Sequence, residues 1–279
     1  MGDGKPLLSK KLVLILIVGG VLRLGLVFTA QGINADAFKY ALTAERMAQK
    51  GMVAGLRGDF FYPHNKLNQR LVVYAYLGSL LYRITGRAIL ALRLVSALAG
   101  IALIAVVYVL CRELFEQEGI ALFSAGLVAL QAEFLRASAS VYREVLMGLF
   151  VAGGQLLVLW SLRREKTWWL FAVGAGLAAF VSFLTRPEGI VLWGCLGLIA
   201  LLPLSKASWR RRLSVCALLG VVFLACQVPY TLWMKSETGY WMLNQWQIER
   251  QTYKHEGKWA NELTREYIVE QYLRGEADD

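Results

Sequence analysis

The chain has 279 residues, 57% of them hydrophobic, with a mean hydropathy of +0.48 and a net charge of +10. This composition excludes an ordinary soluble domain, and the repeated long apolar runs indicate an all-α, polytopic membrane protein. The positive charge does not require a nucleic-acid partner, because Lys and Arg concentrate on the cytoplasmic connections of membrane proteins. The four cysteines lie in or beside apolar runs, which argues against a disulfide framework and against a zinc site.

The first apolar run, 12–30, follows three lysines and is longer than the hydrophobic region of a cleaved signal peptide. We therefore expect an uncleaved first span whose N-terminus is cytoplasmic. Arg23 lies inside this run, where a cation is costly unless it finds a partner or a polar cavity.

A long polar interval follows, and we expect it to form an external loop over 31–88 with two amphipathic surface helices. Apolar residues at roughly helical spacing predict the first of these over 35–50, namely Phe38, Ala41, Leu42, Met47 and Ala48. The second stretch, 71–86, has only about 14 apolar and aromatic residues, which is short for a span.

The charges of the later connections decide whether 71–86 crosses the membrane. The basic connectors 163–166 and 206–212 fall on the cytoplasmic side with the N-terminal lysines only if 71–86 does not span. We therefore predict about seven spans and an external C-terminus. Besides the first, the predicted spans are 89–110, 119–137, 145–162, 168–185, 189–204 and 213–234.

In this topology, ionisable residues from three separate connections share the external face: Asp36, Glu144 and the Arg186-Pro187-Glu188 turn. Each lies beside a helix end, where a membrane protein can place aqueous chemistry. The chain divides into a transmembrane module, 1–234, and an external, partly helical tail, 235–279, whose aromatic residues suit the membrane interface.

The order of these motifs resembles the GT-C superfamily of membrane glycosyltransferases, in particular the branch of protein O-mannosyltransferases and aminoarabinose transferases. The resemblance covers roughly residues 12–230. Its motifs are D-x-x-x-Y at Asp36–Tyr40, the pair Tyr62-Pro63, G-x-x-x-x-x-x-R-L-x-S at Gly86–Ser96, the acid Glu144 that opens a later span, and T-R-P-E-G at Thr185–Gly189.

The resemblance implies a GT-C-like fold over 1–234 and an integral membrane enzyme, in a cell (inner) membrane of the envelope. Such an enzyme moves a sugar from a polyprenyl-phosphate-linked donor to an acceptor hydroxyl of a protein, lipid or glycan. The catalytic base of such enzymes maps onto Asp36 and the second acid onto Glu144, which would position the acceptor. The chain departs from the family in having Glu rather than Asp as second acid and Pro63-His64 in place of Pro-Pro.

A phosphate leaving group needs cations rather than a proton donor, so one carboxylate base can suffice for transfer with inversion. Arg186 and Lys66 are candidates for the donor phosphate, because Arg can grip phosphate with two donors. No cofactor is expected, since a single His beside acids is a poor metal signature, although a divalent metal at Glu144 stays an alternative. The other candidate substrate-binding residues are Tyr40, Tyr62, His64, Arg93 and Glu188.

Each candidate also has a plainer interpretation. Asp36 fits a first-turn acid stabilised by the helix dipole after an Asn34 N-cap. Glu144 fits an acid paired with Arg143 or Arg136, or an acid that lies at a helix N-terminus. Glu188 fits a partner of Arg186, Arg186 and Lys66 fit ordinary interfacial cations, and Arg93 fits a snorkelling side chain. Two further functional classes stay open: a non-catalytic GT-C-like subunit that binds a lipid-linked sugar or a partner, and a transporter or channel.

Overall fold

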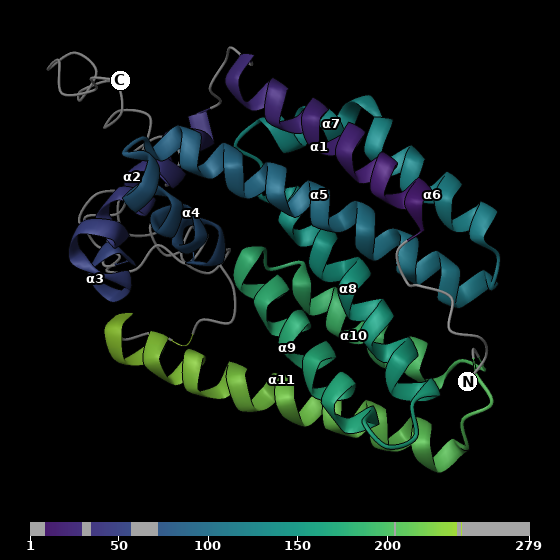
Figure 1. The fold of residues 1–279 in the computed structure, drawn as a ribbon. Helices are drawn as coiled ribbons and strands as arrows, with labels where there is room; N and C mark the ends of the chain where they lie inside the picture. Colours follow the sequence, from purple (N-terminus) through teal and green to yellow (C-terminus); the bar gives the residue numbers. More distant parts are fainter. Residues whose placement is uncertain (1–8, 30–34, 57–71, 204, 239–240, 242–279) are drawn as a thin grey trace, which may run out of the picture.

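The computed structural model describes residues 9–29, 35–56, 72–203, 205–238 and 241, and every regular element in them is an α-helix. Long helices run side by side as a bundle, while α2, α3 and α4 gather at one end of it (Figure 1). The all-α prediction is confirmed. The helices are α1 (Lys10–Thr29), α2 (Ala35–Lys50), α3 (Met52–Leu56), α4 (Val72–Thr85), α5 (Ala88–Phe115), α6 (Glu118–Leu130), α7 (Ala132–Ala139), α8 (Arg143–Arg163), α9 (Trp168–Thr185), α10 (Gly189–Leu201) and α11 (Trp209–Thr238).

Five of the described helices are long and apolar enough to cross a membrane: α1, α5, α8, α9 and α11. The predicted span 119–137 is instead two helices, α6 and α7, which meet at Gln131 with a bend of 54° and together make a sixth candidate. The predicted span 189–204 corresponds to α10, whose 13 residues extend only about 20 Å against a hydrocarbon core of about 30 Å. The protein is a multi-pass membrane bundle, and among the described residues five helices, or six if the bent pair α6 and α7 is one span, have the length and composition of a span.

The two helices predicted for the first loop are present. α2 has the bounds predicted from the sequence, and α4 has 14 residues, too few for a span. Each of these helices is followed by a glycine in a left-handed conformation, Gly51 at φ 89° and Gly86 at φ 66°. Their amides donate to the carbonyls of Met47 and Tyr82, so both helices end by the αL capping device that favours glycine.

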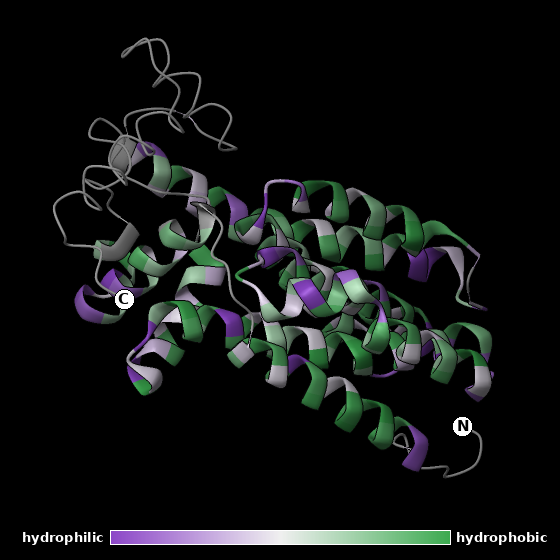
Figure 2. Ribbon diagram, turned by 90° about the horizontal axis from the view of Figure 1, so that it is seen from above, coloured by the Kyte–Doolittle hydropathy of each residue, from purple (hydrophilic) through white to green (hydrophobic). Residues whose placement is uncertain are grey.

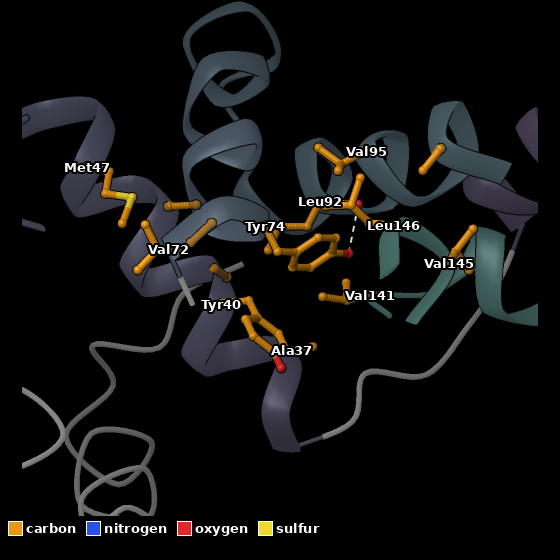
Figure 3. Packing of buried hydrophobic residues seen from close by; sticks show 14 of the residues in the cluster. Ala37, Tyr40, Met47, Val72, Tyr74, Leu92, Val95, Val141, Val145 and Leu146 are labelled. Carbon is orange, nitrogen blue, oxygen red and sulfur yellow. Dashed lines mark hydrogen bonds between the residues drawn. The ribbon is translucent and has the colours of Figure 1, made fainter. Parts of the chain in front are cut away.

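α2 packs against α4 through a buried stripe of Ala37, Tyr40, Ala44 and Met47 (Figure 3). These positions recur at the spacing of one helical face. The stripe differs from the predicted one, because Phe38, Leu42 and Ala48 are only half-buried. Small residues let α2 approach α4 closely, so the face of α2 that carries Ala37, Ala41 and Ala44 makes the contact.

The two basic connections lie together at the end of α8 opposite to Glu144. Arg211 donates to the carbonyls of Ser161, at 3.2 Å, and of Arg164, and stacks over the Trp168 ring at 4.5 Å. Arg212 is buried and binds four carbonyls of the connection after α10, those of Leu201, Leu202, Ser205 and Ala207. Figure 2 shows the helices largely hydrophobic, with hydrophilic residues mainly toward helix ends and connections.

Candidate functional site

The centre of the candidate site is a cation held by two carboxylates from different connections. Glu144 lies in the first turn of α8, and Arg186 and Glu188 lie in the turn between α9 and α10. Arg186 Nη1 lies 2.7 Å from Glu144 Oε1, and Arg186 Nη2 lies 3.1 Å from Glu188 Oε1. Arg186 Nε also donates to Glu188 Oε2 at 3.3 Å. All three nitrogens of the guanidinium therefore contact carboxylate oxygens.

Two residues of the turn, Pro187 and Gly189, explain its backbone conformation between α9 and α10. Pro187 restricts the residue before it to extended backbone, and Arg186 has φ −150° and ψ 140°. Gly189 then lies against the end of α9, where an added Cβ would be 2.2 Å from the Phe183 amide nitrogen. Only glycine fits there, so the chain can turn directly from α9 into α10.

The pairing is reflected in the electrostatics of Glu188. Burial raises the pKa of its carboxyl, but the hydrogen bonds and charge of Arg186 outweigh burial and hold the pKa below its ordinary value. A carboxyl with a depressed folded-state pKa contributes stability above its unfolded pKa and loses it as the pH falls through the folded value. The pair is thus ionised at neutral pH. Its contribution to stability is small, because the Glu188 side chain is 55% exposed.

A hydrogen-bonded network fixes α2, α4, α5 and the start of α8 relative to one another. The Tyr74 hydroxyl donates to the Leu92 carbonyl at 3.0 Å and lies 2.7 Å from Ser96 Oγ (Figure 3). Ser96 Oγ donates to the Tyr142 carbonyl at 3.1 Å, two residues before Glu144. The Tyr40 ring of α2 meets the Tyr74 ring edge-on, with centroids 5.3 Å apart. The network therefore holds the helix that carries Asp36 beside the start of α8.

The predicted site residues fall into three groups. Glu144, Arg186 and Glu188 come together. Asp36 lies in the first turn of α2, but the structure does not describe its side chain. Tyr62, His64 and Lys66 lie outside the described residues. Tyr40 is 5% exposed and its ring is covered by protein, and Arg93 Nη1 donates to the Val27 carbonyl at 3.4 Å.

The predicted pairing of Glu188 with Arg186 is confirmed. The pairing of Glu144 with Arg143 or Arg136 is wrong, because Glu144 binds Arg186 and Arg136 binds Glu133 at 2.9 Å. In the described part of the chain, no three His, Cys, Asp or Glu side chains gather as a metal ion would require.

The sequence interpretation missed Tyr74, Ser96 and Arg143. Arg143 lies over the Tyr40 ring at 5.8 Å and donates to the Thr185 carbonyl at 3.4 Å, so it links α2 to the end of α9. Ser96 ends the R-L-x-S motif, which was the one available signal for this network.

The sequence profile of the dolichyl-phosphate-mannose-protein mannosyltransferases matches residues 70–233, more than half of the chain. The protein belongs to this family. No curated protein matches the chain. The family is part of the GT-C superfamily, and the fold of this member is also that of an archaeal GT-C enzyme.

Solved structures that resemble this family member include those of an Archaeoglobus fulgidus oligosaccharyltransferase. One, in complex with an inhibitory peptide and a dolichol-phosphate, has a TM-score of 0.64 and 17% identity, and the match covers 94% of this chain and 36% of that one. Another, in complex with Zn and sulfate, has a TM-score of 0.66 and 18% identity, over 95% and 39% of the two chains. The apo form has a TM-score of 0.65 and 19% identity over 79% and 29%. The chain thus spans between 29% and 39% of the length of these relatives.

Proposed function

We propose that the protein is an integral membrane glycosyltransferase that moves a sugar from a polyprenyl-phosphate-linked donor to an acceptor hydroxyl. The observation that carries the proposal is the meeting of Glu144 with the Arg186–Glu188 turn, beside the helix α2 that carries Asp36 in its first turn, in a chain of a mannosyltransferase family. Dolichol-phosphate in a structural relative supports a lipid-linked donor.

In the proposed reaction, Asp36 takes the proton of the acceptor hydroxyl as its oxygen attacks C1 of the sugar. The bond from C1 to the phosphate oxygen breaks on the opposite side, so the configuration inverts. The leaving electron pair stays on the lipid phosphate, where a cation stabilises it. The other candidate groups for binding the donor and the acceptor are Tyr62, His64, Lys66, Arg93 and Glu188.

Arg186 is the proposed cation for the donor phosphate. Its fork is held by two carboxylates in the structure, which engage three of its five N–H donors. We propose that the phosphate replaces Glu144 on Nη1, at 2.7 Å in the structure, and that the released Glu144 then positions the acceptor. Arg suits such an exchange because its planar fork offers several donors to one anion.

Arg186→Lys is expected to raise the apparent KM for the donor about tenfold or more, because Lys keeps the charge and loses the fork. A lost charge-assisted bond costs about 1.5–3 kcal/mol, and 1.4 kcal/mol corresponds to about tenfold. The control is Arg136→Lys, in a pair with Glu133 whose side chains are about 70% exposed, which should leave the KM unchanged. If Arg186→Ala leaves the donor KM unaltered, the phosphate binds elsewhere.

We propose that the N-terminus is cytoplasmic and that the candidate site and C-terminus face outward from a cell (inner) membrane. The two basic connections, which meet where Arg211 donates to the Arg164 carbonyl at the C-terminal end of α8, support this orientation because basic connections are typical of the cytoplasmic side.

In a background without the four native cysteines, Trp209→Cys should resist an impermeant thiol reagent added outside, and Arg87→Cys should react. Both side chains replaced are exposed, so accessibility within the protein does not decide the result. Labelling at 209 from outside would reverse the proposed orientation.

Transfer of labelled sugar from a synthetic polyprenyl-phosphate donor by the purified chain tests the proposed function directly. We expect transfer that requires Asp36. Saturable donor binding without transfer would instead assign the chain to the class of non-catalytic, lipid-sugar-binding subunits. Solute flux through vesicles that contain the protein would favour a transporter.

A further inference from the structure

Arg23 is a fully buried cation within α1, and the reaction proposed above does not use it. Its guanidinium donates to three backbone carbonyls, those of Gly19 at 3.1 Å, Ala129 at 3.0 Å and Val128 at 2.8 Å. Its Nε donates to Ser138 Oγ at 3.2 Å. A charge inside a membrane bundle is retained only where such partners offset its desolvation, so this cluster of contacts is a built part of the fold.

The break between α6 and α7 is what makes two of these carbonyls available. The last four carbonyls of an α-helix have no partner within the helix. In α6 the Leu127 carbonyl accepts from the Gln131 amide at 2.9 Å, and Arg23 takes those of Val128 and Ala129. In a membrane such groups must be satisfied from within the protein. Arg23 therefore acts as a C-terminal cap that α1 supplies to α6.

α5 is shaped to admit this contact. An ideal Cβ on Gly100 would lie 2.4 Å from Ser138 Oγ and 2.7 Å from Arg23 Nε, so any larger residue there would push the two apart. One turn earlier on the same helix, Ser96 holds the Tyr142 carbonyl at 3.1 Å. The segment from Ser138 to Tyr142 is thus held at both ends along one face of α5, and Glu144 follows directly.

We propose that Arg23 is a positioning residue for the candidate site. By capping α6 and holding Ser138, it sets the 54° break and hence the point at which α8 begins, where Glu144 meets Arg186. The role at Glu144 rests on the proposed function, whereas the role at the break does not. The two parts can therefore be tested separately.

The first test measures the break without any substrate. Spin labels at Phe123 of α6 and Arg136 of α7, both exposed, report their separation in the purified chain. Arg23→Met removes the donors and keeps an apolar side chain of similar length, and Gly100→Ala separates Arg23 from Ser138. The matched control is Gly20→Ala, where the nearest atom to the added Cβ is at an ordinary 3.5 Å.

We expect the distance distribution to shift or broaden in Arg23→Met and in Gly100→Ala, and to stay unchanged in Gly20→Ala. An unchanged distribution in a folded Arg23→Met protein overturns the proposal. If Arg23→Met does not fold, Gly100→Ala decides in the same way.

The second test asks whether Arg23 acts through Glu144. Arg23→Met should lower the transfer rate on the order of 10²-fold, the cost of about 1 Å of misplacement, in the wild-type background. In a Glu144→Gln background it should cost little more, because groups that act as one unit are not additive. If Arg23→Met lowers the transfer rate by the same factor in both backgrounds, the proposed link between Arg23 and Glu144 is overturned. Absence of transfer by the wild-type chain counts against the proposed function alone, and the distance measurement still tests the break.

Discussion

Asp36→Asn is expected to abolish most sugar transfer while the fold and donor binding stay nearly intact. An acceptor hydroxyl must lose its proton as it attacks C1, and a positioned base contributes roughly 10²–10⁴-fold. Asn keeps the size and hydrogen bonds of Asp but cannot take the proton. Asp36→Glu should also be poor, because about 1 Å of misplacement can cost 10²-fold.

The position of Asp36 in the first turn of α2 gives this experiment a clear alternative. As a helix-dipole partner alone, Asp36 would contribute about 0.3–1 kcal/mol to stability, and Asn would be tolerated. The measurement is transfer from a polyprenyl-phosphate sugar by both purified proteins, with thermal unfolding in detergent as the control. Equal rates at equal stability would contradict the assignment of Asp36 as the base.

Gly189→Ala is expected to destabilise the protein and to disorganise the turn that carries Arg186 and Glu188. The added Cβ would lie 2.2 Å from the Phe183 amide nitrogen and 2.4 Å from the Ser182 carbonyl carbon. These are backbone atoms of α9, so the clash cannot be relieved by rotating a side chain. Overpacking of this kind costs about 1–3 kcal/mol, which exceeds the gain of up to about 1 kcal/mol that Ala brings to a helix.

Gly194→Ala provides the matched control, because it lies on the same helix and an added Cβ there meets nothing within 4 Å. It should leave the free energy of unfolding equal or slightly higher. Thermal unfolding of both variants in one detergent separates the two cases. A Gly189→Ala protein as stable as Gly194→Ala would contradict the close contact between α9 and α10.

The spacing of apolar residues predicted the two helices of the first loop, but it did not predict the break between α6 and α7. α2 could be located because its polar and apolar residues alternate at helical spacing and Gly51 ends it. The break at Gln131 could not, since no Pro or Gly lies between Leu127 and Leu135 to signal it. Its visible partner is Arg23, over a hundred residues away in the chain, and periodicity cannot report such a contact.

Membrane topology predicted which residues of the candidate site share one face of the membrane, but it did not predict which of them form an ion pair. The charge of the connections placed Glu144 and Arg186 on one face, and they form an ion pair across 42 residues of sequence. The identity of the partner was not predictable, because Arg143 and Arg136 are nearer in sequence. Tyr74 escaped notice, and Ser96 was seen only as the end of a motif, because single hydroxyls in apolar helices look neutral until their hydrogen bonds are seen.

The short helix α10 has a consequence for the lipid around the protein. Its 13 residues reach about 20 Å, whereas the 28 residues of α5 reach about 42 Å. A bilayer of uniform thickness cannot match both, and the mismatch is met by local thinning or by tilt. In the polar connection after α10, Arg212 supplies to the backbone carbonyls hydrogen bonds that acyl chains cannot give. Where the mismatch is met by thinning, we expect the annulus of lipid to be thinnest beside the helix that begins at the candidate site.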